Sequence, residues 1–513
     1  MKCPMHYLSA ACAPFATIRK ALPLPPTAKG HRHIGLLPGT RDWAPFLTSM
    51  ARENGDIVLF KYLCQQACLV SHPELIAEVL ITRQGSFSKS NVLENIVGQG
   101  LATSEGELWR SERRLILQAF HRACLPEYSR VAVRRTGRML ARWREGETRD
   151  IYREMTALTL GVAAEAFFGA ELGDDTAALL DALQTAFDAF IVVAAQGFLV
   201  PTWVPTPNNL RFRRAVRTLH RIVGKIISHR KAQVAAGETA QHDLLSILLE
   251  GQQEHPHLTD SILHDEVITF LLGGHETTAN ALAWTAYSLG QHPDAQTQMA
   301  AEARQVSACA IPSFQQLSSL RYAEQVTRES LRLYPPAWYL TRRAEEDVEV
   351  GGYGIRKGTT VVMNLWGLHR DARFYANADT FDPDRWTPEF TRNLPQLAYL
   401  PFGIGPRRCI GASFAQMEML TVLAAIVQQF HLELAPNQVV TPLAATTLRP
   451  LEGVKVVLHD RDRFQAAHDP RACGNPTAPE PLAKACPLSK PHDTLSDRIG
   501  AALLGAPTWA TTS

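Results

Sequence analysis

Apolar residues recur at three- and four-residue spacing along most of the chain from Trp109 onward, and this periodicity predicts a mostly helical protein. The longest such run covers residues 260–292. Thr259 or Asp260 can cap its start, and Pro293 closes it because proline cannot continue a helix. At the rise of an α-helix the run would be about 48 Å long, enough to cross a whole domain.

Strand character appears in short segments on either side of the helical part. Residues 56–60 and 67–71 are predicted strands, and a helix over 74–81 follows them. Residues 347–363 return to strand character, with glycine-containing turns between the strands. The fold class that we predict is therefore mostly α with a smaller β region.

The weakly patterned ends of the chain bound a single large domain. The first 35 residues are proline-rich, and the chain past Asp460 is rich in alanine, proline and polar residues. No linker or internal repeat interrupts the part between them. We predict a leader over residues 1–35, one domain over 36–462 and a partly disordered tail over 463–513.

The composition is that of an ordinary globular protein, and it excludes several classes of function. The formal net charge of +2 on 513 residues gives no whole-protein attraction to nucleic acid or to an anionic membrane. Nine scattered cysteines do not suggest a disulfide framework, which favours a reducing compartment. No run approaches the ~18–20 apolar residues that span a bilayer, and residues 1–20 make a poor signal peptide. We expect a soluble, cytoplasmic monomer with no integral membrane segment and no nucleic-acid partner.

The strongest chemical signal is a glycine- and proline-rich turn that ends in a cysteine. The turn reads F-G-I-G-P-R-R-C-I-G over residues 402–411, and an apolar, helix-compatible run over 412–427 follows it. Unpaired backbone N–H groups and the positive dipole end at the start of that helix stabilise a thiolate at Cys409. Gly405 lets the backbone approach a flat ligand, and Arg407 adds a permanent cation suited to a carboxylate. A buried thiolate beside a planar dianion is what an iron porphyrin needs.

The turn resembles the haem-ligand loop of the cytochrome P450 superfamily, F-x-x-G-x-R-x-C-x-G, and meets every fixed position of it. A buried structural cysteine is the alternative, and the number of matching neighbours disfavours it. The resemblance covers residues 35–460, nearly all but the two ends, and rests on five motifs in the family order. It implies the cytochrome P450 fold, haem b (iron protoporphyrin IX) as cofactor, Cys409 as the axial iron ligand, and haem contacts from Phe402, Gly405 and Arg407.

Two glycines, an acid and a hydroxyl follow one another within the long predicted helix. Residues 273–278 read G-G-H-E-T-T. Each glycine inside a helix costs about 1 kcal/mol relative to alanine, so the pair needs a local reason, such as a large ligand against the backbone. The segment resembles the family's oxygen-activation motif, which implies that Thr277 steadies bound dioxygen and that Glu276 helps to deliver protons. For these residues taken alone, a helix kink with core packing is the alternative.

Glu329 and Arg332 lie at i and i+3 on one predicted helix face, which brings a carboxylate and a guanidinium together. The alternative is an exposed surface pair worth little. Flanking apolar residues and the proline pair at 335–336 favour burial instead. The segment is similar to the family's E-x-x-R element, which a downstream arginine completes, and Arg385 is the residue that this implies. The resemblance gives these three residues a structural role beneath the haem, not a catalytic one.

Trp109 and Arg113 are four residues apart, so one helix face presents an indole N–H and a guanidinium together. They match the family's W-x-x-x-R element, which implies that they hold one haem propionate. A basic, solvated helix is the alternative, because further arginines lie close by. Arg342 matches another propionate ligand of the family, and the adjacent Arg343 leaves the register open.

The resemblance implies a monooxygenase that inserts one oxygen atom from O2 into an organic molecule. The predicted tail is too short for a flavin reductase domain, and its two cysteines are too few to hold an iron–sulfur cluster. We therefore expect electrons from a separate partner, either ferredoxin with ferredoxin reductase or a flavoprotein reductase. Arg110 and Arg114, one turn apart, would present a positive patch to an acidic carrier.

Two other functions fit parts of the sequence. One is a haem-thiolate peroxygenase or isomerase, but such relatives usually lack the acid–threonine pair that this chain has. The other is a non-catalytic haem-binding sensor, against which the absence of an output domain argues. Oxygen-dependent consumption of NAD(P)H with a surrogate redox pair distinguishes these functions from a monooxygenase.

The stretches expected to line a substrate pocket are mainly apolar. They are residues 91–101, 187–199 and 336–340, which supply Leu93, Ile96, Val97, Phe187, Phe190, Phe198, Trp338 and Leu340. Such a lining favours a largely apolar molecule, and no arginine lies in these stretches to bind a carboxylate. We therefore expect a terpenoid or another neutral lipophilic metabolite rather than a free fatty acid.

Overall fold

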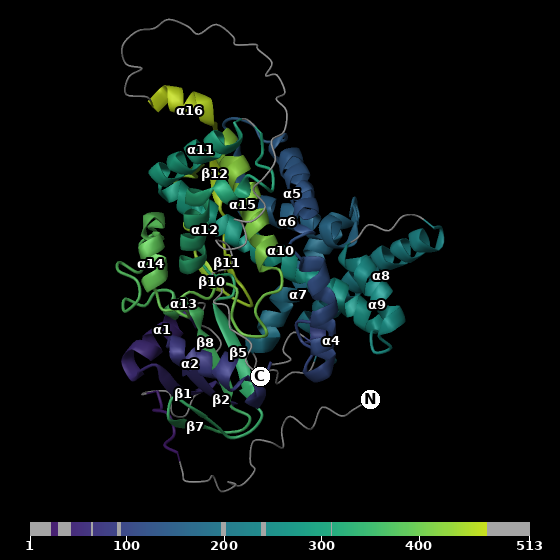
Figure 1. Ribbon diagram of the computed structural model, residues 1–513, viewed down its shortest axis with the longest axis vertical. Coiled ribbons are helices and arrows are strands. Elements are labelled where there is room, and N and C mark those ends of the chain that lie inside the picture. The colour runs from purple at the N-terminus through teal and green to yellow at the C-terminus, as the bar shows by residue number, and fades with distance from the viewer. Residues whose placement is uncertain are drawn as a thin grey trace, which may run out of the picture.

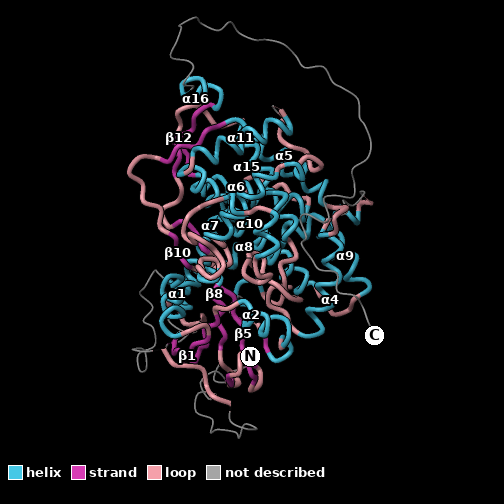
Figure 2. The backbone as a smooth tube through the Cα atoms, turned by 60° about the vertical axis from the view of Figure 1, so that its left-hand side comes forward, coloured by secondary structure: helices cyan, strands magenta, loops and turns pink. Residues whose placement is uncertain are grey.

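The computed structural model describes residues 22–28, 43–62, 65–89, 94–195, 202–237, 243–308 and 310–468. They form a large helical region with a smaller β-rich region at one end (Figure 1 and Figure 2). The prediction of a mostly α fold with a smaller β region is confirmed.

The α-helices are α1 (Trp43–Asn54), α2 (Pro73–Ala77), α3 (Glu94–Val97), α4 (Gly106–Ile116), α5 (Leu125–Leu140), α6 (Ile151–Phe168), α7 (Asp175–Ala195), α8 (Pro207–Ala235), α9 (Leu244–Glu254), α10 (Asp260–Gln291), α11 (Pro293–Ser307), α12 (Arg321–Leu333), α13 (Leu365–Leu368), α14 (Pro388–Asn393), α15 (Ala412–Gln429) and α16 (Arg461–His468). The strands are β1 (Ile57–Tyr62), β2 (Gln65–Val70), β3 (Phe87–Ser88), β4 (Thr148–Asp150), β5 (Tyr339–Ala344), β6 (Val348–Val350), β7 (Tyr353–Ile355), β8 (Thr360–Asn364), β9 (Phe430–Leu434), β10 (Pro442–Ala444), β11 (Leu448–Pro450) and β12 (Lys455–Asp460).

Helix α10 runs through the middle of the helical region (Figure 1). Thr259 caps it by accepting a hydrogen bond from the Ile262 N–H at 3.3 Å, and the helix ends at Gln291, ahead of Pro293. It packs against α6, α12 and α15, and its second half is almost entirely buried. The cap and the proline act locally, which is why the sequence alone predicted both ends of this helix.

The five-stranded sheet of the β-rich region joins segments that are far apart in the sequence. Its order is β1-β2-β8-β5-β3, in which β2 and β8 are parallel and the other pairs are antiparallel. The predicted strands at 56–60 and 67–71 form the hairpin β1–β2. The segment 347–363 forms β6, β7 and most of β8, with turns between them as expected.

Parts of the predicted leader and tail belong to the described structure. The Leu59 N–H donates to the Pro26 carbonyl at 2.7 Å and the Ala28 N–H donates to the Leu59 carbonyl at 2.9 Å, so residues 22–28 pack along β1. Helix α16 spans the start of the predicted tail. The rest of both segments lies outside the described residues. Within the described part of the chain, no helix is both long enough and apolar enough to cross a membrane.

The predicted carboxylate–guanidinium pair is fully buried on α12. Glu329 and Arg332 are both 0% exposed and share two hydrogen bonds of 2.8 Å. Arg385 donates to Glu329 at 2.9 Å and the Trp386 indole donates to it at 3.0 Å. The burial and the third partner predicted from the sequence are both confirmed. The network fixes α12 against the chain that leads towards the cysteine-bearing turn.

Candidate functional site

The turn ahead of α15 carries Cys409 at its end. The Cys409 N–H donates to the Phe402 carbonyl at 3.0 Å, which closes the turn. Gly403 and Gly405 adopt positive φ values of 66° and 74°, a left-handed conformation that side chains rarely tolerate. A Cβ at Gly405 would also lie 2.5 Å from the Leu80 carbonyl oxygen. Gly405 is therefore needed for chain packing, whereas the sequence suggested close approach to a ligand.

The Cys409 thiol faces open space inside the fold. The side chain is exposed, yet enough protein surrounds it that burial raises the pKa of its thiol. The Gly411 N–H and the cations of Arg113, Arg408 and Lys89 act in the opposite direction, but their effect is smaller. The backbone N–H at the helix start that the sequence predicted is thus present, but burial has the larger effect on the pKa of the thiol. Coordination to a metal would reverse this balance, because a coordinating thiol is deprotonated outright.

Open space also adjoins α10 at the predicted glycine pair. Gly273 is exposed in the middle of this otherwise buried helix, and nothing lies within 4 Å of the position of its Cβ. Gly274 differs, because its Cβ would lie 3.0 Å from the Phe167 ring of α6. The first glycine therefore leaves room for a ligand, and the second allows close packing of two helices.

Aromatic rings link this part of α10 to the cysteine-bearing turn. The Phe167 ring packs on Phe120, with centroids 5.3 Å apart. Phe120 in turn lies 3.6 Å from the Cβ position of Gly411, two residues after Cys409. Helices α10 and α15 also pack directly on one another. Phe167 and Phe120 therefore join the part of α10 at the glycine pair to the start of α15, although the two segments are far apart in the sequence.

Glu276 and Thr277 leave α10 in different directions. The Thr277 hydroxyl donates to the Gly273 carbonyl at 2.7 Å and so lies on the open side of the helix. Glu276 is buried and accepts a hydrogen bond of 2.7 Å from the Thr447 hydroxyl. Burial raises the pKa of Glu276. The arrangement places a hydroxyl beside the open space and an acid that readily holds a proton next to it along the helix.

A cluster of cations, Lys89, Arg113, Arg342 and Arg407, lies near the cysteine-bearing turn. Burial and the charges of Arg407, Arg342 and Arg113 lower the pKa of Lys89 to about 7. Burial and the charge of Arg407 lower the pKa of Arg342 to about 10. Glu105 pairs with Arg407 and is the acid that opposes the charges on Lys89 and Arg342. The excess of positive charge suits a ligand that carries two carboxylates.

Trp109 of α4 is a platform for these cations. The guanidinium of Arg407 lies 4.2 Å from the centre of the indole, and that of Arg113 lies 5.8 Å from it. Arg113 also donates to the Arg408 carbonyl at 2.9 Å. The four-residue spacing of Trp109 and Arg113 therefore brings both of them to the arginine of the cysteine-bearing turn.

The strand β5 separates the two arginines whose register the sequence left open. Successive strand residues point to opposite faces, so Arg342 and Arg343 diverge. Arg342 is half-buried among the cations, whereas Arg343 is exposed and lies 3.8 Å from the Cβ position of Gly358. Arg342 is therefore the member of the pair that belongs to the cluster.

The expected cofactor fits the residues that the structure brings together. An exposed thiol inside the fold, an open face at Gly273 and an excess of half-buried cations match the iron, the flat ring and the two carboxylates of a haem. Lys89 and Glu105 were not predicted from the sequence. No motif marks either residue, because both reach the arginines only through the packing of the fold.

The residues predicted to line a substrate pocket differ in their surroundings. Four of them are buried: Ile96, Val97, Phe187 and Trp338. Three lie outside the described side chains: Leu93, Phe190 and Phe198. Leu340 is half-buried and contacts the turn at Gly403, with 3.8 Å between its Cδ1 and the Cβ position of that glycine. Among the described members of the set, Leu340 is therefore the one with exposed surface beside the cysteine-bearing turn.

Two acids at the start of α10 hold the loop between α3 and α4. The Gln99 N–H donates to Asp265 at 2.9 Å, and the Leu101 N–H donates to the two oxygens of Glu266 at 3.0 and 3.1 Å. The loop expected to border the pocket is therefore tied to the helix that carries the acid–hydroxyl pair.

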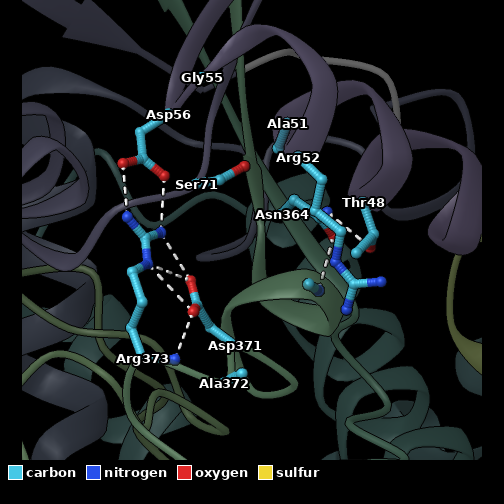
Figure 3. A pocket seen from close by; sticks show the side chains of 11 residues that line it. Thr48, Ala51, Arg52, Gly55, Asp56, Ser71, Asn364, Asp371, Ala372 and Arg373 are labelled. Carbon is cyan, nitrogen blue, oxygen red and sulfur yellow. Dashed lines mark hydrogen bonds and ion pairs between the residues drawn. The ribbon is translucent and has the colours of Figure 1, made fainter.

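A separate cleft of about 450 Å³ lies in the β-rich region, between α1 and the segment that follows β8 (Figure 3). One of its two arginines, Arg373, makes two contacts of 2.7 Å with Asp56 and also binds Asp371, and Arg52 is the other. Two arginines and two aspartates line the cleft, so its formal charges balance. None of the predicted site residues lines it.

Comparisons with known proteins agree with this geometry. A sequence model of the family described as Cytochrome P450 matches residues 25–457. The pentalenene oxygenase of Streptomyces avermitilis is 33% identical over 411 residues, which cover 79% of this chain and 90% of that protein. The cyclooctat-9-en-7-ol 5-monooxygenase of Streptomyces melanosporofaciens is 34% identical over 403 residues, which cover 76% and 85% respectively.

Another relative and a solved structure extend the comparison. The cyclooctatin synthase of Streptomyces melanosporofaciens is 33% identical over 414 residues, or 79% of this chain and 87% of that protein. The structure of the retinoic acid bound cyanobacterial CYP120A1 superposes with a TM-score of 0.76 at 27% identity, covering 86% of this chain and 100% of that one. The fold and the sequence motifs thus lead to the same group of proteins.

Proposed function

Because the chain belongs to the cytochrome P450 family and is a monooxygenase, we propose that it inserts one oxygen atom from O2 into a largely apolar small molecule of the terpenoid class. The observation that carries the substrate class is the similarity to three bacterial oxygenases with terpenoid chemistry, over about four-fifths of the chain. The mainly apolar stretches expected around the pocket support it.

We propose haem b as the cofactor and Cys409 as its axial ligand. Members of the cytochrome P450 family bind haem through a thiolate, and a bound haem supplies the iron centre at which O2 is activated. Trp109, Arg113, Arg342 and Arg407, with Lys89, would neutralise the two propionates. Phe402 and Gly405 would hold the turn in the shape that presents the thiol. The haem domain in this proposal spans residues 36–462, with the described part of the leader packed along its sheet.

The acid–hydroxyl pair of α10 provides the proton chemistry in this proposal. Thr277 lies on the open side of the helix and can hydrogen-bond to dioxygen or to a water beside it. Glu276 is the group that holds a proton next to it. The Thr277 hydroxyl positions the dioxygen or the water, and Glu276 donates the proton. The electrons taken from NAD(P)H then end in product rather than in released peroxide.

Electrons would come from a ferredoxin with its reductase or from a flavoprotein reductase. The predicted basic patch on α4 is weaker than its sequence suggested, because Arg110 pairs with Glu107 at 2.8 Å. Arg114 is exposed and remains the better candidate for contact with an acidic carrier. We propose that the protein acts as a monomer in the cytoplasm.

The substrate class is tested by titrating a terpenoid library and a matched set of fatty acids into the haem-loaded protein. We expect saturable shifts of the haem absorption band with neutral terpenoids and none with the fatty acids. Turnover with a surrogate redox pair should then yield a mono-oxygenated terpenoid. Shifts confined to fatty acids would overturn the substrate class, and product formed from hydrogen peroxide alone would favour a peroxygenase.

Haem retention should distinguish Arg342 from its neighbour. Replacing Arg342 with alanine removes a charge-assisted hydrogen bond to a propionate, worth about 1.5–3 kcal/mol, which corresponds to a roughly tenfold to hundredfold faster loss of haem. Arg343→Ala is the matched control and should lose haem at the parent rate, because that side chain points away from the cluster. Equal rates for the two variants would contradict the assignment.

Replacing Thr277 with alanine should uncouple electron use from product formation. The variant should bind haem and substrate normally, because the hydrogen bond of the Thr277 hydroxyl to the Gly273 carbonyl lies within its own helix. It should still consume NAD(P)H but release peroxide or water in place of product. Thr277→Ser keeps the hydroxyl and should restore the ratio of product to NAD(P)H consumed. An unchanged ratio in Thr277→Ala would remove this residue from the proton chemistry.

A further inference from the structure

Glu276 is held by the hairpin β10–β11, not by its sequence neighbour Thr277. Its side chain is 7% exposed, and its Oε1 accepts from the Thr447 hydroxyl at 2.7 Å. Its Oε2 has no hydrogen-bond partner among the described residues. The Asn280 side-chain amide, one turn further along α10, donates to the same hydroxyl at 3.0 Å. A buried carboxyl oxygen without a partner is costly unless the group is protonated or reached by water.

From Thr447 the strand β11 leads to the surface. Two residues further on, Arg449 forms an ion pair of 2.5 Å with Asp188 of α7. The Arg449 side chain is 11% exposed and that of Asp188 is 50% exposed. Tyr152 of α6 lies against Arg449 and close enough to Glu276 to be affected by its charge. These groups extend from bulk solvent at Asp188 to the buried acid.

We propose that the Arg449–Asp188 ion pair and the Thr447 hydroxyl are positioning elements for Glu276, and that they mark the place where solvent protons enter the reaction. This inference rests on the role of Glu276 as proton donor proposed above. It adds residues from three other elements, which no sequence motif connects to the acid.

Titratable groups from α6, α7, α10 and β11 surround Glu276. Arg449 of β11 lowers the pKa of Glu276 and Asp188 of α7 raises it, while burial raises it most. Tyr152 of α6 is neutral, because burial and the charge of Glu276 raise its pKa to about 12. His275 of α10 is neutral, because burial lowers its pKa to about 4. Arg449 is therefore the cation that keeps this buried acid able to ionise.

The proton balance of one cycle closes within these groups. Neutral Glu276 gives its proton to water on the Thr277 side and becomes a carboxylate, which the Thr447 hydroxyl and the Arg449 cation stabilise. A solvent proton that arrives past Asp188 then restores the neutral acid at Oε2. One proton moves from solvent to the pocket, and Glu276 ends the cycle unchanged.

The test is a direct titration of Glu276 in haem-loaded protein that is not turning over. Infrared difference spectra between the parent and Glu276→Gln isolate the carboxyl band and its pH midpoint. Arg449→Gln removes the cation, so the midpoint should rise by about one pH unit. Asp188→Asn removes the opposing acid, so the midpoint should fall. Asp181→Asn removes an exposed charge from the same helix α7 and should leave the midpoint unchanged.

Arg449→Gln should also shift the pH profile of product formed per NAD(P)H consumed to higher pH, and Asp188→Asn should shift it to lower pH. Thr447→Val should lower that ratio, and Thr447→Ser should restore it. A midpoint that is identical in the parent, Arg449→Gln and Asp188→Asn would overturn the inference, as would shifts in one common direction. If the midpoints shift as expected but no oxygenated product forms with any substrate, the proposed function is wrong, whereas the inferred effect of Arg449 and Asp188 on Glu276 is supported. Asp188 is half-exposed, so its variant will fold even if Arg449→Gln does not.

Discussion

Replacing Cys409 with alanine will abolish the thiolate-type absorption band that the reduced, carbon monoxide-treated protein should show. The band requires a sulfur ligand at the iron, and Cys409 is the exposed cysteine among those that the structure describes. The polypeptide should stay folded, because alanine keeps the N–H that bonds to Phe402 and removes no buried side chain from the core. Absorption spectra and circular dichroism on the same sample measure both expectations.

Cys124→Ala is the matched control for this substitution. The Cys124 side chain is half-buried, and its thiol lies 3.6 Å from the Gln118 carbonyl. The Cys124→Ala variant therefore also loses one sulfur, but at a different position in the fold. This variant should keep the band in full. A Cys409→Ala protein that retains the band would show that another residue binds the iron.

Replacing Glu329 with alanine will destabilise the fold more than any other single change considered for this protein. It leaves the guanidinium of Arg332 fully buried without its carboxylate and removes one acceptor of Arg385 and the acceptor of the Trp386 indole. Breaking a buried ion pair from one side costs about 3–5 kcal/mol, a large part of the stability of a typical protein. We expect little folded protein at 37 °C and a strongly lowered midpoint of unfolding in urea.

Glu324→Ala tests whether this cost depends on burial. Glu324 lies on the same helix and is 4.0 Å from Arg328, with about a third of its side chain exposed. An ion pair of this kind contributes about 1 kcal/mol or less, so the urea midpoint should change little. Equal destabilisation by the two substitutions would mean that the buried network has no special role.

Local rules were sufficient to predict the longest helix and several strands of this protein from its sequence. The cap at Thr259 and the stop at Pro293 defined α10, because capping and proline act within one turn of the chain. The hairpin β1–β2 and the strands after β5 followed from alternation and from glycine turns in the same way. Much of the leader and most of the tail lie outside the described residues, so the predictions for them remain untested by the structure.

The sequence also identified the chemical residues that lie close together along the chain. Cys409 and Arg407, Glu276 and Thr277, and Glu329 and Arg332 are each separated by three residues or fewer. A turn or a helix then sets their relative position, whatever the rest of the fold does. Their proposed roles came from the family resemblance, because spacing alone leaves a surface pair or a helix kink as alternatives.

Only the tertiary structure decided which distant groups meet these residues. The Thr447 hydroxyl reaches Glu276 across 171 positions of sequence, and Lys89 and Glu105 join the arginines from elements that no motif connects. The packing of Leu80 against Gly405 likewise gave that glycine a reason other than the one predicted. Periodicity shows that a helix or strand has an apolar face, but which surface that face meets depends on the packing of the whole core. The chain's local patterns are therefore enough to predict its longest helix, several strands and the local motifs, whereas the charge and the hydrogen bonding around those motifs depend on the packed fold.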